Sequence, residues 1–169
     1  MFIFFLLTRS AFASGAELTN LVVKSTHADL LMDLELKGVF TNEMKDALLR
    51  ELPVSFNFFI TFYEVYDYWF DKKIANLTIL HKIEYDASKK EYRVTRSWKK
   101  TGPIVTRNLL KARVSMSEIV GLKVIPLTRL KRGKHYQLNV KSELNEKRLL
   151  LFNFPWEFET DWYTINFNY

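Results

Sequence analysis

The sequence alternates apolar and polar residues with a period of two in two long segments. In residues 28–37 the apolar side chains recur at every second position, at Leu30, Met32, Leu34 and Leu36. Residues 54–66 repeat the pattern with larger side chains, at Phe56, Phe58, Ile60 and Phe62. Successive side chains of a β-strand point to opposite faces, whereas a helix repeats every 3.6 residues. The alternation therefore predicts half-buried strands and favours a fold in which sheet faces pack on a core.

Other segments extend this β pattern. Residues 18–25 are expected to pair with the first alternating segment across a turn at Thr26 and His27. Residues 74–85 and 91–97 predict a hairpin closed by the polar turn 86–90. Further strands are expected over residues 134–144, 149–154 and 156–169. This spacing predicts a mainly β fold, an antiparallel β-sandwich of about seven to eight strands, formed as one domain over residues 16–169.

Two short helices are expected between the strands. Thr41 or Asn42 can cap the first helix, and Pro53 stops it because proline cannot continue the hydrogen-bond ladder. Ser115 and Glu118 have the spacing of a capping box, in which each side chain satisfies a free backbone amide of the first turn. This second motif predicts a helix that opens at Ser115 and ends near Gly121.

The first thirteen residues have the features of an export signal. An apolar run, Phe2–Leu7, precedes Ala11-Phe12-Ala13, and small residues at those positions fit a signal peptidase that cleaves before Ser14. The run is short and no basic residue precedes it, so we expect the true start to lie upstream; the alternative is a buried first strand. We expect a periplasmic protein, either free or peripheral to the envelope membranes, with no transmembrane helix in the mature chain.

The chain contains no cysteine, which excludes several classes of site. It has no disulfide, no thiol nucleophile, no thiolate metal site and no lipid-attachment cysteine. The five glycines are too dispersed to form a phosphate-binding loop, and no Gly-x-Ser-x-Gly motif is present. We expect no cofactor and no catalytic residue.

Charge is distributed unevenly along the chain. Residues 88–148 carry 17 Lys and Arg against 4 Glu, a net of +13, and the remainder carries 8 basic and 15 acidic residues, a net of −7, which together give the overall +6. Such asymmetry indicates an anionic partner: a membrane surface, a glycan or an acidic protein. Nucleic acid is not expected for an exported chain. The alternative is that acidic and basic strands lie side by side and neutralise one another.

The densest basic stretch is the candidate binding site. Arginine offers a planar fork for phosphate or carboxylate, and lysine a mobile point charge. The candidate binding residues are Arg129, Lys131, Arg132, Lys134, Lys99 and Lys100, with Arg107, Lys111 and Arg113 nearby in the sequence. The alternative for this stretch is a loop that only keeps the protein in solution.

Histidines and carboxylates offer weaker candidates. His81 shares a predicted strand face with apolar residues and is expected to be buried and hydrogen-bonded, whereas His27 and His135 lie beside turns and are expected to be exposed. No metal site is expected from the spacing of the three histidines. Glu157, Glu159 and Asp161 alternate on one predicted strand. They could bind Ca²⁺ or act as an acid/base pair, but the solvated face of an edge strand is the simpler interpretation.

Several short motifs resemble a bacterial family known only as a domain of unknown function, number four-three-nine-zero. The resemblance spans residues 16–169 and rests on packing and turn patterns, at Leu48–Phe58, Tyr68–Asp71, Ile83–Asp86, Glu91–Val94, Ser115–Ile119, Tyr136–Val140 and Thr160–Phe167. Residues 101–114 match least well. The resemblance implies a signal-bearing envelope protein without an assigned activity, and it supplies no catalytic residues.

These observations favour a non-enzymatic periplasmic or cell-envelope binding or accessory protein that contacts an anionic partner through a basic face. Two alternatives stay open. The alternation of Tyr163, Ile165, Phe167 and Tyr169 is also typical of a small outer-membrane barrel. The carboxylates at 157, 159 and 161 could instead serve an enzyme of unrecognised type.

Overall fold

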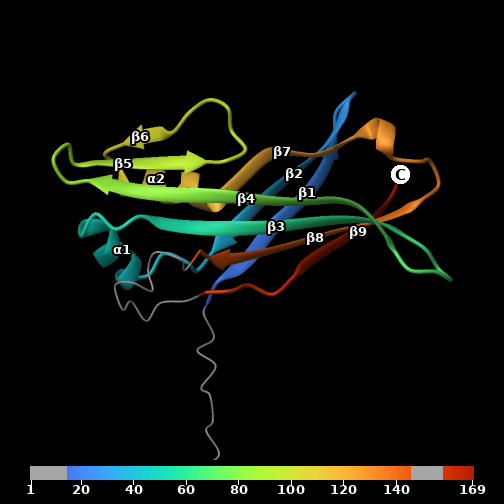
Figure 1. Ribbon diagram of the computed structural model, residues 1–169, viewed down its shortest axis with the longest axis horizontal. Coiled ribbons are helices and arrows are strands. Elements are labelled where there is room, and N and C mark those ends of the chain that lie inside the picture. Colours follow the sequence, from blue (N-terminus) through green and yellow to red (C-terminus); the bar gives the residue numbers. More distant parts are fainter. Residues whose placement is uncertain (1–14, 146–157) are drawn as a thin grey trace, which may run out of the picture.

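The computed structural model describes residues 15–145 and 158–169, which form a mainly β structure with two antiparallel sheets (Figure 1). The predicted sandwich-like fold is confirmed, with nine strands in the described residues where about seven to eight were expected. The strands are β1 (Glu17–Ser25), β2 (Asp29–Lys37), β3 (Val54–Val65), β4 (Lys72–Asp86), β5 (Glu91–Arg96), β6 (Ile104–Thr106), β7 (Glu118–Pro126), β8 (His135–Leu144) and β9 (Tyr163–Asn168). The helices are α1 (Asn42–Leu49), α2 (Leu109–Ser117) and the short 3₁₀ turn η1 (Leu127–Arg129).

The smaller sheet has the strand order β1-β2-β7. The alternating apolar residues of β2 are buried, as predicted, and β1 pairs with β2 across the expected turn. The pairing of β2 with β7 shifts register near Asp33, where Gly121 adopts a positive φ of 72°. The Asp33 carboxylate accepts a 2.8 Å hydrogen bond from the Gly121 amide and pairs with Lys24. Burial would raise the pKa of Asp33, but these two contacts outweigh it and lower that pKa.

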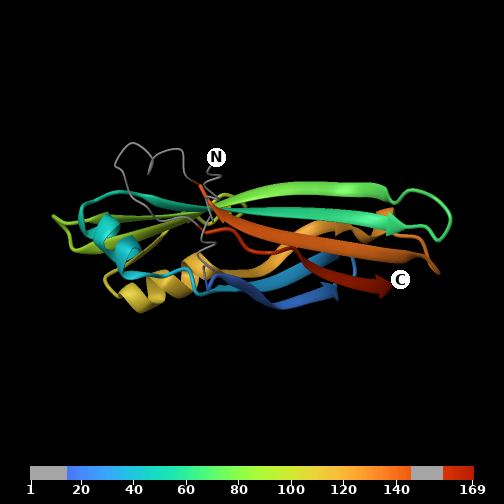
Figure 2. The same ribbon diagram turned by 90° about the horizontal axis from the view of Figure 1, so that it is seen from below.

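The larger sheet has the order β6-β5-β4-β3-β8-β9, with β3 and β4 at its centre. Every second residue of β3 is buried over its whole length, from Val54 to Glu64. The two sheets form two layers, and β1 approaches β9 along one side (Figure 2). Because the smaller sheet covers only part of the larger one, α2 packs against β4, β5 and β6 and covers the rest.

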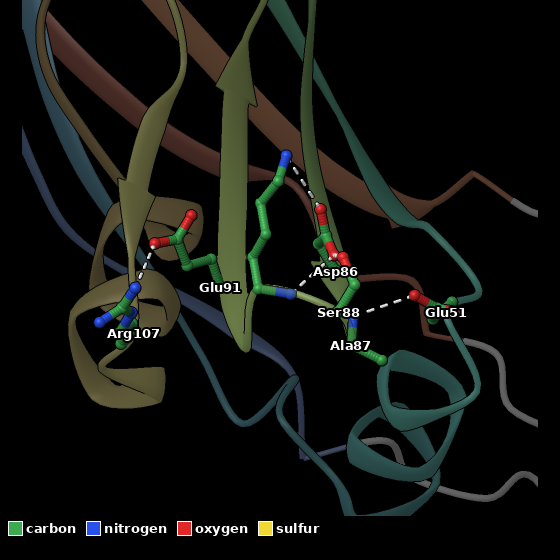
Figure 3. A network of polar contacts seen from close by, with 7 residues as sticks. Glu51, Asp86, Ala87, Ser88, Glu91 and Arg107 are labelled. Atoms are coloured by element: carbon green, nitrogen blue, oxygen red, sulfur yellow. Dashed lines mark hydrogen bonds and ion pairs between the residues drawn. The ribbon is translucent and has the colours of Figure 1, made fainter.

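The predicted hairpin of β4 and β5 is confirmed, with its turn at the end of the molecule where α1 lies (Figure 1). Figure 3 shows the polar contacts of this turn. Asp86 accepts hydrogen bonds from the Ser88 hydroxyl at 2.6 Å and the Lys89 amide at 3.1 Å. The hydroxyl contact, followed by the amide contact, lowers the pKa of Asp86. Glu51, just after α1, accepts a 2.9 Å hydrogen bond from the Ala87 amide and ties the turn to the helix.

The first helix agrees with its prediction and the second does not. Thr41 caps α1 by accepting a 3.3 Å hydrogen bond from the Met44 amide. The predicted capping box at Ser115 is wrong, because α2 begins earlier and ends at Ser117. Asn108 caps it instead, accepting a 3.1 Å hydrogen bond from the Lys111 amide. Glu118 is extended and begins β7, where it pairs with Glu35 of β2, so tertiary pairing overrides the local motif.

The last strand is shorter than predicted. The expected strand over 156–169 reduces to β9, preceded by an isolated bridge between Glu143 and Glu159. The strand predicted over 149–154 lies outside the described residues, as does the signal peptide predicted over 1–13.

Candidate functional site

The basic residues at 129–134, here called the basic turn, lie at one end of the molecule. They begin at Arg129, the last residue of η1, and lead into β8. The first residue of β8, His135, pairs with Val65 at the end of β3 and with Asn168 at the end of β9. The turn therefore lies beside the hairpin that connects β3 and β4, and both views place the two loops at the same end (Figures 1 and 2).

Buried and backbone contacts hold the basic turn in place. Leu130 packs into the core, and the hydroxyl of the buried Tyr136 accepts a 2.8 Å hydrogen bond from the Lys131 amide. The Tyr136 ring stacks on Phe62, with 5.4 Å between the ring centroids. Gly133, with a positive φ of 72°, donates its amide to the carbonyl of Tyr169 at 2.6 Å. The cationic side chains therefore extend from a backbone that is anchored by the contacts of Leu130, Lys131 and Gly133.

The charges of the turn are only partly used within the fold. Arg129 Nη2 donates to the carbonyl of Ile74 in β4 at 2.7 Å, so this side chain also fastens the turn to the larger sheet. Lys131, Arg132 and Lys134 are exposed. Over residues 15–145 and 158–169, none of these three makes an ion pair with a carboxylate.

Basic side chains elsewhere do pair with carboxylates. Four ion pairs in the described part of the chain involve a cation of residues 88–148, the stretch with the net charge of +13: Lys89–Asp86, Arg107–Glu91, Lys123–Asp29 and Lys141–Glu159. Only Lys123–Asp29 and Lys141–Glu159 join that stretch to an acidic residue on a different element outside it, so neutralisation by neighbouring strands is seen for part of the stretch and, within the described residues, not for the basic turn.

Three consecutive aromatic residues form the tip of the hairpin between β3 and β4. Tyr68 is 98% exposed, Trp69 78% and Phe70 88%, the highest values among the large hydrophobic side chains of the described residues. The rings of Trp69 and Phe70 contact each other edge to face at 6.4 Å. We call residues 66–71 the aromatic tip. This site was not among those predicted from the sequence, although an aromatic run between two predicted strands was a visible signal.

The aromatic tip and the basic turn are in contact. Lys134 Nζ lies 5.7 Å from the centroid of the Tyr66 ring, a cation–π geometry. The tip closes on itself through a 3.2 Å hydrogen bond from the Tyr66 amide to Asp71. A hydrogen bond from the Tyr66 hydroxyl to the buried Glu64 raises the pKa of Tyr66. These contacts fix the base of the tip and leave its three outer rings in solvent.

Two further lysines add to the charge at this end. Lys72 and Lys73, both exposed, are the first residues of β4, directly after the tip. Among the described residues, the exposed carboxylates at this end are Asp67 and Asp71, so that six cations, counting Arg129, lie near two exposed anions. The end of the molecule therefore combines a net positive charge with an exposed apolar surface.

Lys99 and Lys100, predicted together with the turn, lie elsewhere. Ser97 pairs with Leu80, whereas Arg129 contacts Ile74, six residues away along β4. At about 3.3 Å per residue, these two contact points on β4 lie roughly 20 Å apart. Lys99 lies over the Trp98 ring at 4.2 Å and reaches the Val120 carbonyl at 3.4 Å. The fold therefore brings Arg129, Lys131, Arg132 and Lys134 together and leaves Lys99 and Lys100 apart.

His81 is buried and hydrogen-bonded, as predicted. Its Nδ1 lies 2.8 Å from the Met116 carbonyl, and its Nε2 accepts a 3.0 Å hydrogen bond from the Trp98 indole. Burial lowers the pKa of His81 to about 4. His27 and His135 are exposed, as predicted, and lie on other elements. Among the described residues, no three His, Asp or Glu side chains are grouped in a way that could hold a metal ion.

The candidate carboxylates near the chain end take different positions. Glu159 is exposed and pairs with Lys141, and Asp161 is exposed. Glu157 lies outside the described residues. Neither α1 nor α2, nor any other helix in the described part of the chain, is long and apolar enough to span a membrane.

Comparison with known proteins gives a family but no activity. No curated protein and no solved structure matches the chain. A family model described as a domain of unknown function, DUF4390, matches residues 13–166, nearly the whole chain. The resemblance expected from the short sequence motifs is confirmed. The chain belongs to this family, the domain of unknown function DUF4390.

Proposed function

We propose that the protein is a non-enzymatic module of the bacterial cell envelope, exported to the periplasm, that binds an anionic partner through the basic turn. Support for export comes from the apolar run and the Ala11-Phe12-Ala13 motif at the start of the chain. Support for binding rather than catalysis comes from the use of His81 and Glu159 in contacts within the fold.

The observation that carries the proposal is the set of three exposed cations on an anchored backbone, Lys131, Arg132 and Lys134, which make no ion pair with a carboxylate in the described part of the chain. Each Lys or Arg near an anionic surface contributes about 1 kcal/mol. Anchoring lowers the entropy that these groups lose on binding, because the backbone that carries them is already ordered. Three such side chains are sufficient for a binding site whose affinity falls with added salt.

The test compares the mature wild-type protein with the variant Lys131→Gln/Arg132→Gln/Lys134→Gln. Binding is measured to a soluble polyanion such as heparin and to vesicles that contain phosphatidylglycerol, at low and at high salt. Removal of three charges should weaken binding to both probes about 100-fold at low salt. Arg129 is left unchanged because it also holds the turn against β4.

The matched control removes the same charge from the opposite half of the molecule. Lys45, Arg93 and Lys111 are exposed and lie on α1, β5 and α2. The variant Lys45→Gln/Arg93→Gln/Lys111→Gln should bind nearly as well as the wild type. An equal loss of binding affinity in both variants would show that net charge alone drives binding. Failure of the wild type to bind either probe would contradict the proposal outright.

A further inference from the structure

We propose that the anionic partner is the surface of a phospholipid bilayer, and that the aromatic tip enters its interfacial layer while the basic turn contacts the headgroups. This inference rests on the proposed function and names the partner of the same site. It is carried by two features that lie together at one end of the molecule: three solvent-exposed aromatic rings, and a set of cations that make no ion pair with a carboxylate of residues 15–145 and 158–169.

The exposure of the rings is the first step. Tyr68, Trp69 and Phe70 leave most of their surface in water, although burial of aromatic side chains of this size contributes strongly to the stability of cores and interfaces. Trp and Tyr concentrate at membrane–water interfaces, where an apolar ring and a polar group are both satisfied. An exposed apolar patch of this kind marks an interaction site.

The shape of the tip is the second step. It is the outermost loop of the two central strands, and it extends along the long axis beyond the rest of this end (Figures 1 and 2). Its internal contacts are the Tyr66–Asp71 hydrogen bond and the Trp69–Phe70 ring pair. A narrow projecting loop can insert among lipid headgroups, where the surrounding phase adapts to its shape.

Charge complementarity is the third step. Lys72 and Lys73 lie on one side of the tip, and the basic turn, with Lys134 against Tyr66, lies on the other. Anionic headgroups attract basic segments within about a Debye length of the surface. Asp67 and Asp71 oppose this attraction, but Asp71 is engaged with the Tyr66 amide and the cations outnumber both. Aromatic insertion and headgroup attraction therefore act on the same loop cluster.

The test uses flotation with vesicles of phosphatidylcholine alone or with phosphatidylglycerol. The tip variant Tyr68→Ser/Trp69→Ser/Phe70→Ser removes exposed rings and should fold as the wild type does, which a thermal melt checks. It should bind the anionic vesicles at least about tenfold more weakly and lose salt-resistant binding. Its affinity for the soluble polyanion should stay unchanged, because that probe needs only the basic turn.

Insertion itself is measured by quenching of tryptophan fluorescence by brominated acyl chains. Wild-type fluorescence should be quenched on binding, and Trp69→Phe should abolish that quenching while it keeps most of the affinity. Quenching that persists in Trp69→Phe, or tip-variant binding equal to wild type, would overturn the inference. If the wild type binds the polyanion but no vesicles, the bilayer is the wrong partner while the proposed function stands. If it binds neither, the proposed function has failed.

Discussion

The buried side chain of His81 must stay neutral for the folded state to be stable. The Met116 carbonyl can only accept a hydrogen bond and the Trp98 indole can only donate one. The ring must therefore carry its proton on Nδ1 and keep Nε2 free, which is the neutral form. Protonation of Nε2 would oppose the Trp98 N–H and place a charge in the core. Burial, more than any neighbouring charge, lowers the pKa of His81 to about 4.

The free energy of unfolding should therefore fall as the pH drops from about 6.5 towards 4. The unfolded chain takes up a proton on this histidine near its ordinary pKa of about 6.5, whereas the folded chain resists it until about 4. A shift of this size corresponds to about 3 kcal/mol. Urea denaturation at a series of pH values measures the slope. Asp33 and Asp86, whose pKa values are lowered below 3.8, affect stability only at lower pH.

His81→Gln provides the control, because it should flatten the slope in this window while lowering stability at pH 7. If that variant does not fold, titration of the His81 ring in the wild type by NMR gives the same information. A ring that titrates near its ordinary pKa would contradict the account.

At the scale of the element, periodic patterns were predictable, and local signals were predictable where no long-range pairing overrode them, as at the Thr41 cap. The alternation in β2 and β3 and the polar turn between β4 and β5 identified those strands, because each pattern reflects one buried face. The capping box at Ser115 failed because the chain there is already paired with β2 in β7. The aromatic tip was missed because its residue types usually indicate a core strand.

The two possible caps of α2 can be separated by substitution. Asn108→Ala should lower the free energy of unfolding by about 1 kcal/mol, because the Lys111 amide loses its partner. Ser115→Ala should have a smaller effect, since Ser115 lies in the last turn of the helix rather than at its start. Thermal denaturation of both variants measures the difference. A larger loss for Ser115→Ala would contradict the observed boundary.

At the scale of the whole molecule, the two central strands connect two chemically different ends. One end carries α1 and the Asp86–Lys90 turn, and the other carries the aromatic tip and the basic turn (Figure 1). The gathering of Arg129, Lys131, Arg132 and Lys134 beside the tip depends on the register of β8 with β3 and β9. Long-range register is not contained in any local pattern, so the sequence could predict the basic residues but not their neighbours.

This arrangement predicts end-on binding to a bilayer. The absence of native cysteine allows single-site labels without a background. A nitroxide at Tyr68→Cys should report membrane depth by relaxation agents when the protein binds anionic vesicles. One at Ala87→Cys should stay in water, because β4 spans about 45 Å between the two ends. Equal depth for both labels would show that the molecule lies flat and would contradict this orientation.

The route of the chain between the sheets gives the basic turn a second property. Strand β7 belongs to the smaller sheet and β8 to the larger one, so the turn is a covalent crossover between them, whereas α1 and α2 make the crossovers at the other end. The turn is therefore tied by covalent bonds to both sheets, so that displacing it would disturb the pairing of β7 with β2 in the smaller sheet and of β8 with β3 and β9 in the larger one.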